Sequence, residues 1–145
     1  MGRSLATGIA TAVVNASVEE CAAHEFYLNS RGFRRTAKNR GITEYPFKKL
    51  NDHTFYYTNT RDLGFFLNLR DWRNEVTRIK EESGKVIMVV SDTKDLMEEY
   101  PVKDRNVLAS IQSVLIFEPI NPIGDIPQRA MSFPTRLTLE VVFQQ

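Results

Sequence analysis

The chain has 145 residues, of which 42% are hydrophobic and 26% are charged, with a formal net charge of +1 at pH 7. This size and composition are typical of one globular domain, and the near-neutral charge gives no electrostatic case for binding nucleic acid. A single cysteine excludes an internal disulfide, and no secretory signal or membrane-length apolar run is present, so we expect a cytoplasmic protein.

A strand over residues 8–16 and a helix that begins at Ser17 are the first predicted elements. Ser17 and Glu20 have the spacing of a capping box, in which each side chain bonds to the other residue's backbone amide. The apolar stripe of this helix consists of Val18, Cys21, Ala22, Phe26 and Leu28. Gly32 is expected to end the helix, and Cys21 is expected to be a small core residue rather than a nucleophile.

A basic segment follows, which we predict to be a connector over residues 33–41. Its cations, with one just before it, are Arg31, Arg34, Arg35, Lys38 and Arg40. Two interpretations are open: a solvated loop, or a patch that contacts the phosphates of an anionic membrane or another acidic surface.

From residue 42 onward the pattern predicts β-strands. They are expected over residues 43–50, 54–60, 105–118 and 136–143, with an apolar loop over 62–69 and a proline-rich loop over 119–127. Pro46 favours an edge or bulged position for the first of these strands. The loop aromatics Phe65 and Phe66 either contact another apolar surface or fold inward.

A long hairpin is predicted over residues 70–93, with its turn at Glu82-Ser83-Gly84-Lys85. Its second strand, residues 86–90, is continuously apolar, as is typical of a strand buried on both faces. Its first strand is charged, so it is half solvated, near an edge, or facing a cavity. The order of elements, β then α then at least five antiparallel strands, indicates an α+β fold.

No catalytic motif is recognisable in the sequence. The two histidines, His24 and His53, lack the spacing of a metal site, and no nucleophile elbow or phosphate-binding glycine loop is present. We therefore assign no catalytic residue and expect no metal and no cofactor.

Four short strings, in order along the chain, resemble the START domain, a lipid-binding branch of the helix-grip families. They are residues 12–23 (Ala-Val-Val-Asn-Ala-Ser-Val-Glu-Glu-Cys-Ala-Ala), 68–72 (Asn-Leu-Arg-Asp-Trp), 100–103 (Tyr-Pro-Val-Lys) and 124–128 (Gly-Asp-Ile-Pro-Gln). The second departs from the family's Asn-Arg-Asp-Phe by one inserted residue and by Trp in place of Phe.

The resemblance implies a curved antiparallel sheet that grips a C-terminal helix, with a tunnel for one hydrophobic ligand between them. The chain ends at Gln145, where the family would continue into that helix. We therefore expect residues 1–145 to be a single START-like domain that is either part of a longer protein or covered on its concave face by something else.

The expected ligand-binding residues come from the central strands, and an ordinary place in the core is the alternative for each. They are Val76, Met88, Val90, Ile111, Leu115, Leu139 and Val141, together with Arg105. Four charges lie among these strands: Arg70, Asp71, Arg105 and Glu140. If turned inward, such a charge would need a partner and could orient the polar group of a lipid; the outward, solvated position is the alternative.

Three hypotheses for function follow from these observations. The first is non-catalytic binding or transfer of a lipid or other hydrophobic small molecule. The second is an enzyme of the cyclase or hydratase type, because related helix-grip folds include such enzymes. The third is an interaction module, a degenerate START-like domain that forms a homodimer or pairs with a partner through its uncovered sheet face.

Overall fold

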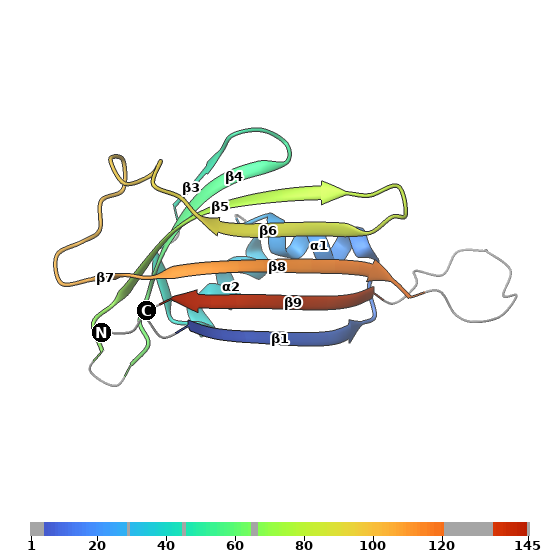
Figure 1. Ribbon diagram of the computed structural model, residues 1–145, viewed down its shortest axis with the longest axis horizontal. Helices are drawn as coiled ribbons and strands as arrows, with labels where there is room; N and C mark the ends of the chain where they lie inside the picture. Colours follow the sequence, from blue (N-terminus) through green and yellow to red (C-terminus); the bar gives the residue numbers. More distant parts are fainter. Residues whose placement is uncertain (1–4, 29, 45, 65–66, 121–134, 145) are drawn as a thin grey trace, which may run out of the picture.

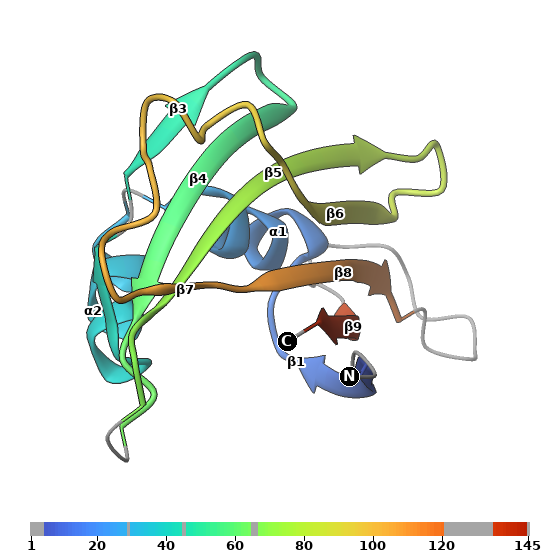
Figure 2. The ribbon, with the colours of Figure 1, turned by 60° about the vertical axis from the view of Figure 1, so that its left-hand side comes forward.

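The protein is a curved β-sheet with two short helices on its concave side (Figures 1 and 2). The computed structural model describes residues 5–28, 30–44, 46–64, 67–120 and 135–144. The helices are α1 (Val18–Phe26) and α2 (Arg31–Asn39). The strands are β1 (Leu5–Val14), β2 (Ile42–Glu44), β3 (Phe47–Lys49), β4 (Thr54–Arg61), β5 (Arg70–Lys80), β6 (Val86–Asp92), β7 (Val107–Leu108), β8 (Ser110–Pro119) and β9 (Thr135–Gln144). The predicted α+β class with a curved antiparallel sheet is confirmed.

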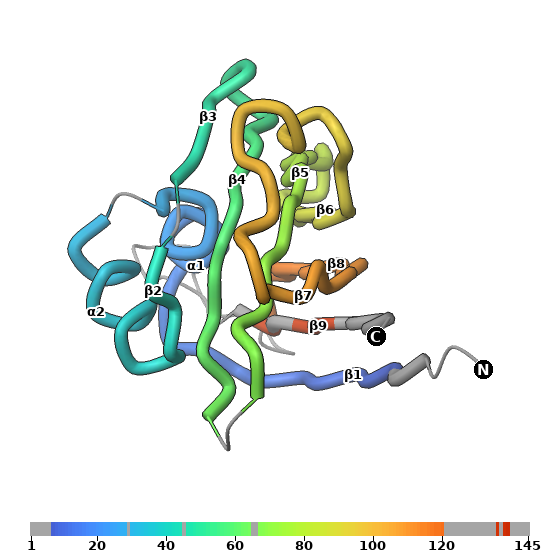
Figure 3. Tube along the Cα trace, turned by 90° about the vertical axis from the view of Figure 1, so that its left-hand side faces the viewer, coloured from blue at the N-terminus to red at the C-terminus, as the bar shows by residue number. Residues whose placement is uncertain are grey.

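The strand order along the sheet is β1-β9-β8-β6-β5-β4-β2, with β3 also paired to β4. All of these pairs are antiparallel, whereas β7 pairs in parallel with the start of β5. The pairing of β1 with β9 places the first and last described strands side by side (Figure 1). Figure 3 shows both helices on the same side of β4, where the sheet curves around them.

The predicted hairpin is β5 and β6, joined by a turn in which Gly84 has φ +83°. This positive φ is the reason for a glycine there. β5 lies between β4 and β6, so the edge position considered for it is wrong. The half-solvated alternative is also wrong for Asp71 and Arg73, which are 0% and 5% exposed. The connector that follows β6 covers them, and the Arg73 Nε donates to the Tyr100 carbonyl at 2.7 Å.

Helix α1 begins at the predicted cap, Ser17, but ends earlier than predicted, at Phe26. The Ser17 hydroxyl accepts a hydrogen bond from the Glu20 amide, and the Glu20 carboxylate accepts one from the Ser17 amide, which completes the capping box. The buried α1 residues pack against residues of four strands in one cluster. That cluster comprises Val18, Ala22, Phe26, Leu28, Phe55, Val76, Val86, Met88, Val90 and Phe117, with Cys21 packed against it.

The basic connector predicted over residues 33–41 is wrong, because residues 31–39 form the helix α2. Gly32 does not end α1; it lies in the first turn of α2, where the Ser30 side chain accepts a hydrogen bond from the Phe33 amide at 3.1 Å. Gly41, with φ +69°, follows the C-cap Arg40. The helix therefore has a serine before it and a left-handed glycine after it, a common pair of boundaries.

Other strand boundaries also differ from the prediction, and the first strand, expected over residues 8–16, is β1 at Leu5–Val14. Residues 43–50 form two short strands, β2 and β3, separated around Pro46, which has no amide hydrogen to donate. The strand expected over 105–118 begins later, because Arg105 adopts φ +69° and lies outside β7 and β8. Phe65, Phe66 and most of the proline-rich loop lie outside the described residues. No helix among the residues that the structure describes is long and apolar enough to cross a membrane.

Candidate functional site

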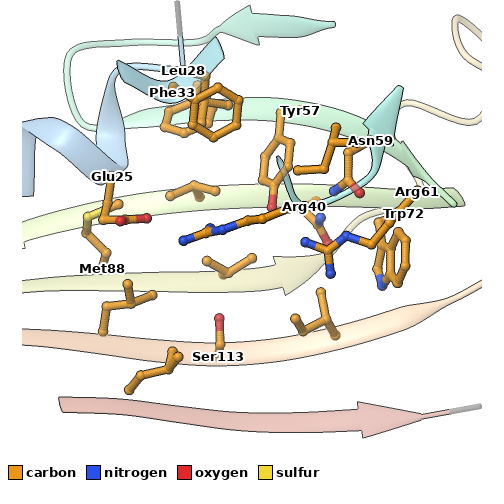
Figure 4. Close-up of a pocket in the computed structure, with 18 residues that line it drawn as sticks. Glu25, Leu28, Phe33, Arg40, Tyr57, Asn59, Arg61, Trp72, Met88 and Ser113 are labelled. Carbon is orange, nitrogen blue, oxygen red and sulfur yellow. The ribbon is translucent and has the colours of Figure 1, made fainter. Parts of the chain in front are cut away.

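A partly open cavity of about 300 Å³ lies between the concave face of the sheet and the two helices. It exists because alternate residues of each strand face inward, while α1 and α2 cover only part of that face. Eighteen side chains line it (Figure 4): Glu25, Leu28, Phe33, Arg40, Ile42, Phe55, Tyr57, Asn59, Arg61, Trp72, Asn74, Val76, Met88, Val90, Ile111, Ser113, Leu115 and Leu139.

The apolar wall of this cavity contains six of the eight residues expected to bind a ligand. They are Val76, Met88, Val90, Ile111, Leu115 and Leu139. The sheet register brings them together, because cross-strand partners share a face: Val76 is opposite Val90, Met88 is opposite Leu115, and Leu115 is opposite Leu139. Their role in ligand binding stays a prediction.

The other two expected residues do not contribute to the described lining. The side chain of Val141 lies outside the described part of the chain. Arg105 is exposed in the connector before β7 and does not line the cavity. Among the four charges considered as inward-facing, Asp71 is fully buried on the opposite face of the sheet. There it accepts hydrogen bonds from the Thr60 hydroxyl and the Asn106 amide.

One end of the cavity is polar and is built by β4 and β5. Tyr57 is opposite Asn74, and Asn59 is opposite Trp72, so all four side chains share the concave face. Arg61, the last residue of β4, lies beside Trp72, with its guanidinium carbon 5.8 Å from the centroid of the indole ring. Figure 4 shows Asn59, Arg61 and Trp72 to the right of Met88.

Two of these polar groups lack hydrogen-bond partners within the described chain. Asn74 is fully buried, yet neither its Oδ1 nor its Nδ2 is paired. The Nε of Arg61 is buried and unpaired as well. Because an unsatisfied buried polar group costs roughly 1–3 kcal/mol, such groups in a cavity indicate where a bound polar atom would be most favourable.

The electrostatics of this polar end follow from its low hydration. Burial raises the pKa of the Tyr57 phenol, an effect that neighbouring Asn74 and Arg61 partly offset. Burial also lowers the pKa of the Arg61 guanidinium, and the nearby positive charge of Arg40 lowers it further. At neutral pH the Tyr57 hydroxyl is therefore a proton donor, and Arg61 is a cation in an environment that disfavours positive charge.

Arg40, which lines this cavity, is followed by Gly41 at the junction of α2 with β4. The Asp62 amide donates to the Gly41 carbonyl at 2.9 Å, which fastens the end of α2 to the end of β4. A Cβ on Gly41 would lie 2.5 Å from the Asp62 carbonyl oxygen, so only glycine permits this approach. Figure 4 shows the Arg40 side chain crossing the cavity toward Glu25 of α1, but the described side chains form no ion pair here within 4.0 Å.

Sequence reasoning missed the polar end, although a signal for it was present. Val76 was expected to face inward, and the two-residue period of a strand then places Asn74 and Trp72 on the same face. The same period on β4 aligns Phe55 with Tyr57, Asn59 and Arg61.

Among the described residues, no group of three or more His, Cys, Asp or Glu side chains is arranged to hold a metal ion.

Comparison with known proteins shows similarity of fold alone. No family model matches the sequence, and no curated protein sequence matches it. The lipid transfer and protein localization domain of human StarD13 superimposes with a TM-score of 0.74 at 16% identity, covering 95% of this chain and 62% of that domain's chain. Human STARD10 superimposes with a TM-score of 0.73 at 13% identity, covering 99% of this chain and 53% of the other.

A second group of similar structures consists of norcoclaurine synthase structures from Thalictrum flavum. Truncated norcoclaurine synthase from Thalictrum flavum superimposes with a TM-score of 0.56 at 6% identity, covering 99% of this chain and 78% of the enzyme. The chain thus spans somewhat more than half the length of the two human structures. The START resemblance is confirmed at the level of the fold, which is the START-like helix-grip fold.

Proposed function

We propose that this chain binds a lipid or another hydrophobic small molecule, without catalysis, in the cavity between the sheet and the two helices. The observation that carries the proposal is the apolar wall of a cavity of about 300 Å³ in a START-like fold. Pockets for small ligands are usually concave, mostly apolar and equipped with a few polar groups, and this cavity has each of these properties.

Binding would be driven by removal of apolar ligand surface from water. Each methylene group transferred to the wall contributes about 0.8 kcal/mol. Val76, Val90 and Leu115, which belong to three neighbouring strands, present a continuous surface for such groups. The proposal includes transfer of the ligand between membranes. The cavity is partly open, so a bound molecule would enter and leave through its open side.

Native mass spectrometry of the protein purified from cells tests this proposal. We expect a population whose mass exceeds that of the chain by one small molecule, which extraction with organic solvent releases for identification. Displacement of a fluorescent fatty acid or sterol probe is the second readout. Absence of any bound species, together with no displacement by any lipid class, would contradict the proposal.

We also propose that α2 makes a peripheral contact with an anionic membrane. Its cations Arg31, Arg34, Arg35 and Lys38 are exposed, as is the C-cap Arg40, and no described residue forms an ion pair with any of them. Each cation near a negatively charged leaflet is worth about 1 kcal/mol, and the attraction is screened by salt. Because Arg40 also lines the cavity, this contact would place the cavity mouth close to the membrane.

Vesicle co-sedimentation tests the membrane contact. We expect binding to vesicles that contain phosphatidylserine, weaker binding as sodium chloride is raised, and a loss of most binding in the triple variant Arg31→Gln, Arg34→Gln, Arg35→Gln. The control is Lys80→Gln, which removes an exposed cation from the far end of β5. Equal binding of the triple variant and the control would contradict this role of α2.

The enzyme hypothesis has one observation in its favour, since Glu25 and Tyr57 line the same cavity. A carboxylate and a phenol in one cavity are groups that can exchange protons with a substrate. The homodimer likewise stays a prediction, and sedimentation velocity at several concentrations tests it.

A further inference from the structure

Resting on the proposed ligand-binding function, we propose that the ligand is a singly charged amphiphile. Its oxyanion head, such as a carboxylate, would bind at Arg61 and Asn74. Its single apolar tail would lie against the wall formed by Val76, Val90 and Leu115. The cavity would thus select its ligand by charge as well as by hydrophobicity.

The balance of charges around the cavity supports a negative head. The lining contains two arginines, Arg40 and Arg61, and one carboxylate, Glu25. Figure 4 shows the Arg40 guanidinium extending toward Glu25, whereas that of Arg61 lies at the other end, near Trp72. Arg61 is therefore the cation that no carboxylate of the described lining approaches, and an anionic ligand would supply the missing charge.

The unpaired donors around Arg61 support an oxyanion in particular. The guanidinium has several N–H groups in one plane, which suits two parallel hydrogen bonds to the oxygens of a carboxylate. The unpaired Nδ2 of Asn74 and the hydroxyl of Tyr57, its cross-strand neighbour, are further donors at the same end. A neutral hydrocarbon bound in the cavity would leave the Asn74 Nδ2 and the Arg61 Nε unpaired, at a cost in affinity.

The volume of the cavity favours one short tail. If each non-hydrogen atom takes the ~30 Å³ that a water molecule occupies in the liquid, the cavity encloses roughly ten such atoms. A ten-carbon chain with a carboxylate is close to this size. A phospholipid with two long chains exceeds this volume several-fold.

The test compares three ligands that share a ten-carbon tail and differ in head group: decanoate, decanol and decyltrimethylammonium. Binding is measured by isothermal titration calorimetry, below the critical micelle concentrations, to the wild-type chain. We expect decanoate to bind at least about ten-fold more tightly than decanol, because hydrogen bonds to charged groups are stronger than those between neutral groups. Decyltrimethylammonium should bind most weakly. This comparison needs no variant, so it does not depend on how a substitution affects folding.

Two variants assign the head-group preference to Arg61. Arg61→Gln is expected to weaken decanoate binding about ten-fold or more while leaving decanol binding within about two-fold. The matched control is Arg70→Gln, which removes the same charge from the cross-strand partner of Arg61 but from outside the cavity lining. It should retain the preference for decanoate.

The outcomes separate this inference from the function on which it rests. Equal binding of decanoate and decanol to the wild-type chain would overturn the inference while supporting a hydrophobic cavity. Loss of the preference in Arg70→Gln to the same extent as in Arg61→Gln would overturn the assignment to Arg61. Failure of all three ligands to bind, together with no lipid bound to the purified protein, would overturn the proposed function itself.

Discussion

The guanidinium carbon of Arg61 lies 5.8 Å from the centroid of the Trp72 ring, over the face of the only tryptophan in the chain. Arg61 is the last residue of β4, and Trp72 lies in the first third of β5. A cation over an indole face is attracted to the ring, by about 0.5–1 kcal/mol at exposed sites and more where water is excluded. Trp72 therefore holds the Arg61 side chain at the polar end of the cavity.

The position of Trp72 provides a spectroscopic signal for binding. Because Trp72 lines the cavity beside Arg61, a ligand whose head reaches Arg61 changes the surroundings of the indole. We predict that saturation with decanoate shifts the tryptophan emission, with the same apparent dissociation constant as that found by calorimetry. Calorimetric binding without any change in emission would place the ligand away from this end.

Gly41 is predicted to be the glycine whose substitution is most damaging. Gly41 and Gly84 both have positive φ, so alanine at either position costs roughly 1–2 kcal/mol in backbone strain. Only at Gly41 would the added Cβ also lie 2.5 Å from a backbone oxygen, whereas at Gly84 it meets nothing within 4 Å. We expect Gly41→Ala to lower the free energy of unfolding in urea clearly more than Gly84→Ala. Equal losses would show that the close approach of Gly41 to Asp62 is absent in solution.

Asp71 is predicted to stabilise the fold rather than to bind ligand. Its carboxylate accepts hydrogen bonds from Thr60 at 2.7 Å, from Asn106 at 3.0 Å and from the Lys103 amide at 3.2 Å, and the Arg73 guanidinium lies 3.6 Å away. Removing one member of a buried charge pair typically costs about 3–5 kcal/mol.

We therefore expect Asp71→Ala to lower the free energy of unfolding by about 3 kcal/mol or more. The control is Glu99→Gln, which breaks the exposed pair with Lys48 and should cost less than about 1 kcal/mol. Urea denaturation of both variants measures the difference. A small effect of Asp71→Ala would mean that the connector after β6 is not held by this carboxylate.

Two tyrosines are predicted to make the fold sensitive to alkaline pH. Burial raises the pKa of Tyr57, and the hydrogen bond from Tyr56 to Asp95, 2.6 Å long, raises the pKa of Tyr56 to about 12. The folded state therefore keeps both phenols protonated at pH values where the unfolded chain, with a tyrosine pKa of 10.0, ionises. Their contribution to stability is complete below pH 10 and is lost as the pH rises from there through the folded-state pKa values.

A pH series of urea unfolding curves, combined with the ultraviolet absorbance of tyrosinate, measures this loss. We expect the free energy of unfolding to fall above pH 10 and to fall less steeply in Tyr56→Phe. A wild-type chain whose stability is unchanged above pH 10 would contradict the burial of Tyr57.

The elements that could be predicted are those whose signal is local. The α1 cap needs only Ser17 and Glu20, three residues apart, and the β5–β6 turn needs only Gly84 between two strand-like runs. The sequence pattern does not reveal α2, because Gly32 resembles the end of the first helix, although Ser30 begins a new helix there. Ser30, which caps α2, and Gly32, which resembles a helix end, are only two residues apart. The sequence pattern alone therefore does not tell whether a helix ends or begins at this point.

The candidate site could be predicted only in part, for a different physical reason. Periodicity identified the apolar wall, because Met88 and Leu115 belong to evident strands. The polar residues of β4 and β5 follow from strand periodicity, but Arg40 lies next to the contact between Gly41 and Asp62, which joins a helix end to a strand end twenty-one residues away in sequence. Such a contact is set by packing, and no local pattern shows that it brings Arg40 into the cavity with Arg61.

The central claim is that ligand lies in the cavity rather than on the exposed apolar residues of the opposite side of the sheet. Nuclear Overhauser effects between the methylene protons of unlabelled decanoate and the labelled methyl groups of the protein test it directly. We predict contacts to Val76, Val90 and Leu115, and a shift of the Arg61 Nε–H resonance. Contacts confined to exposed residues such as Ile9, Val13 and Ile79 would contradict the account.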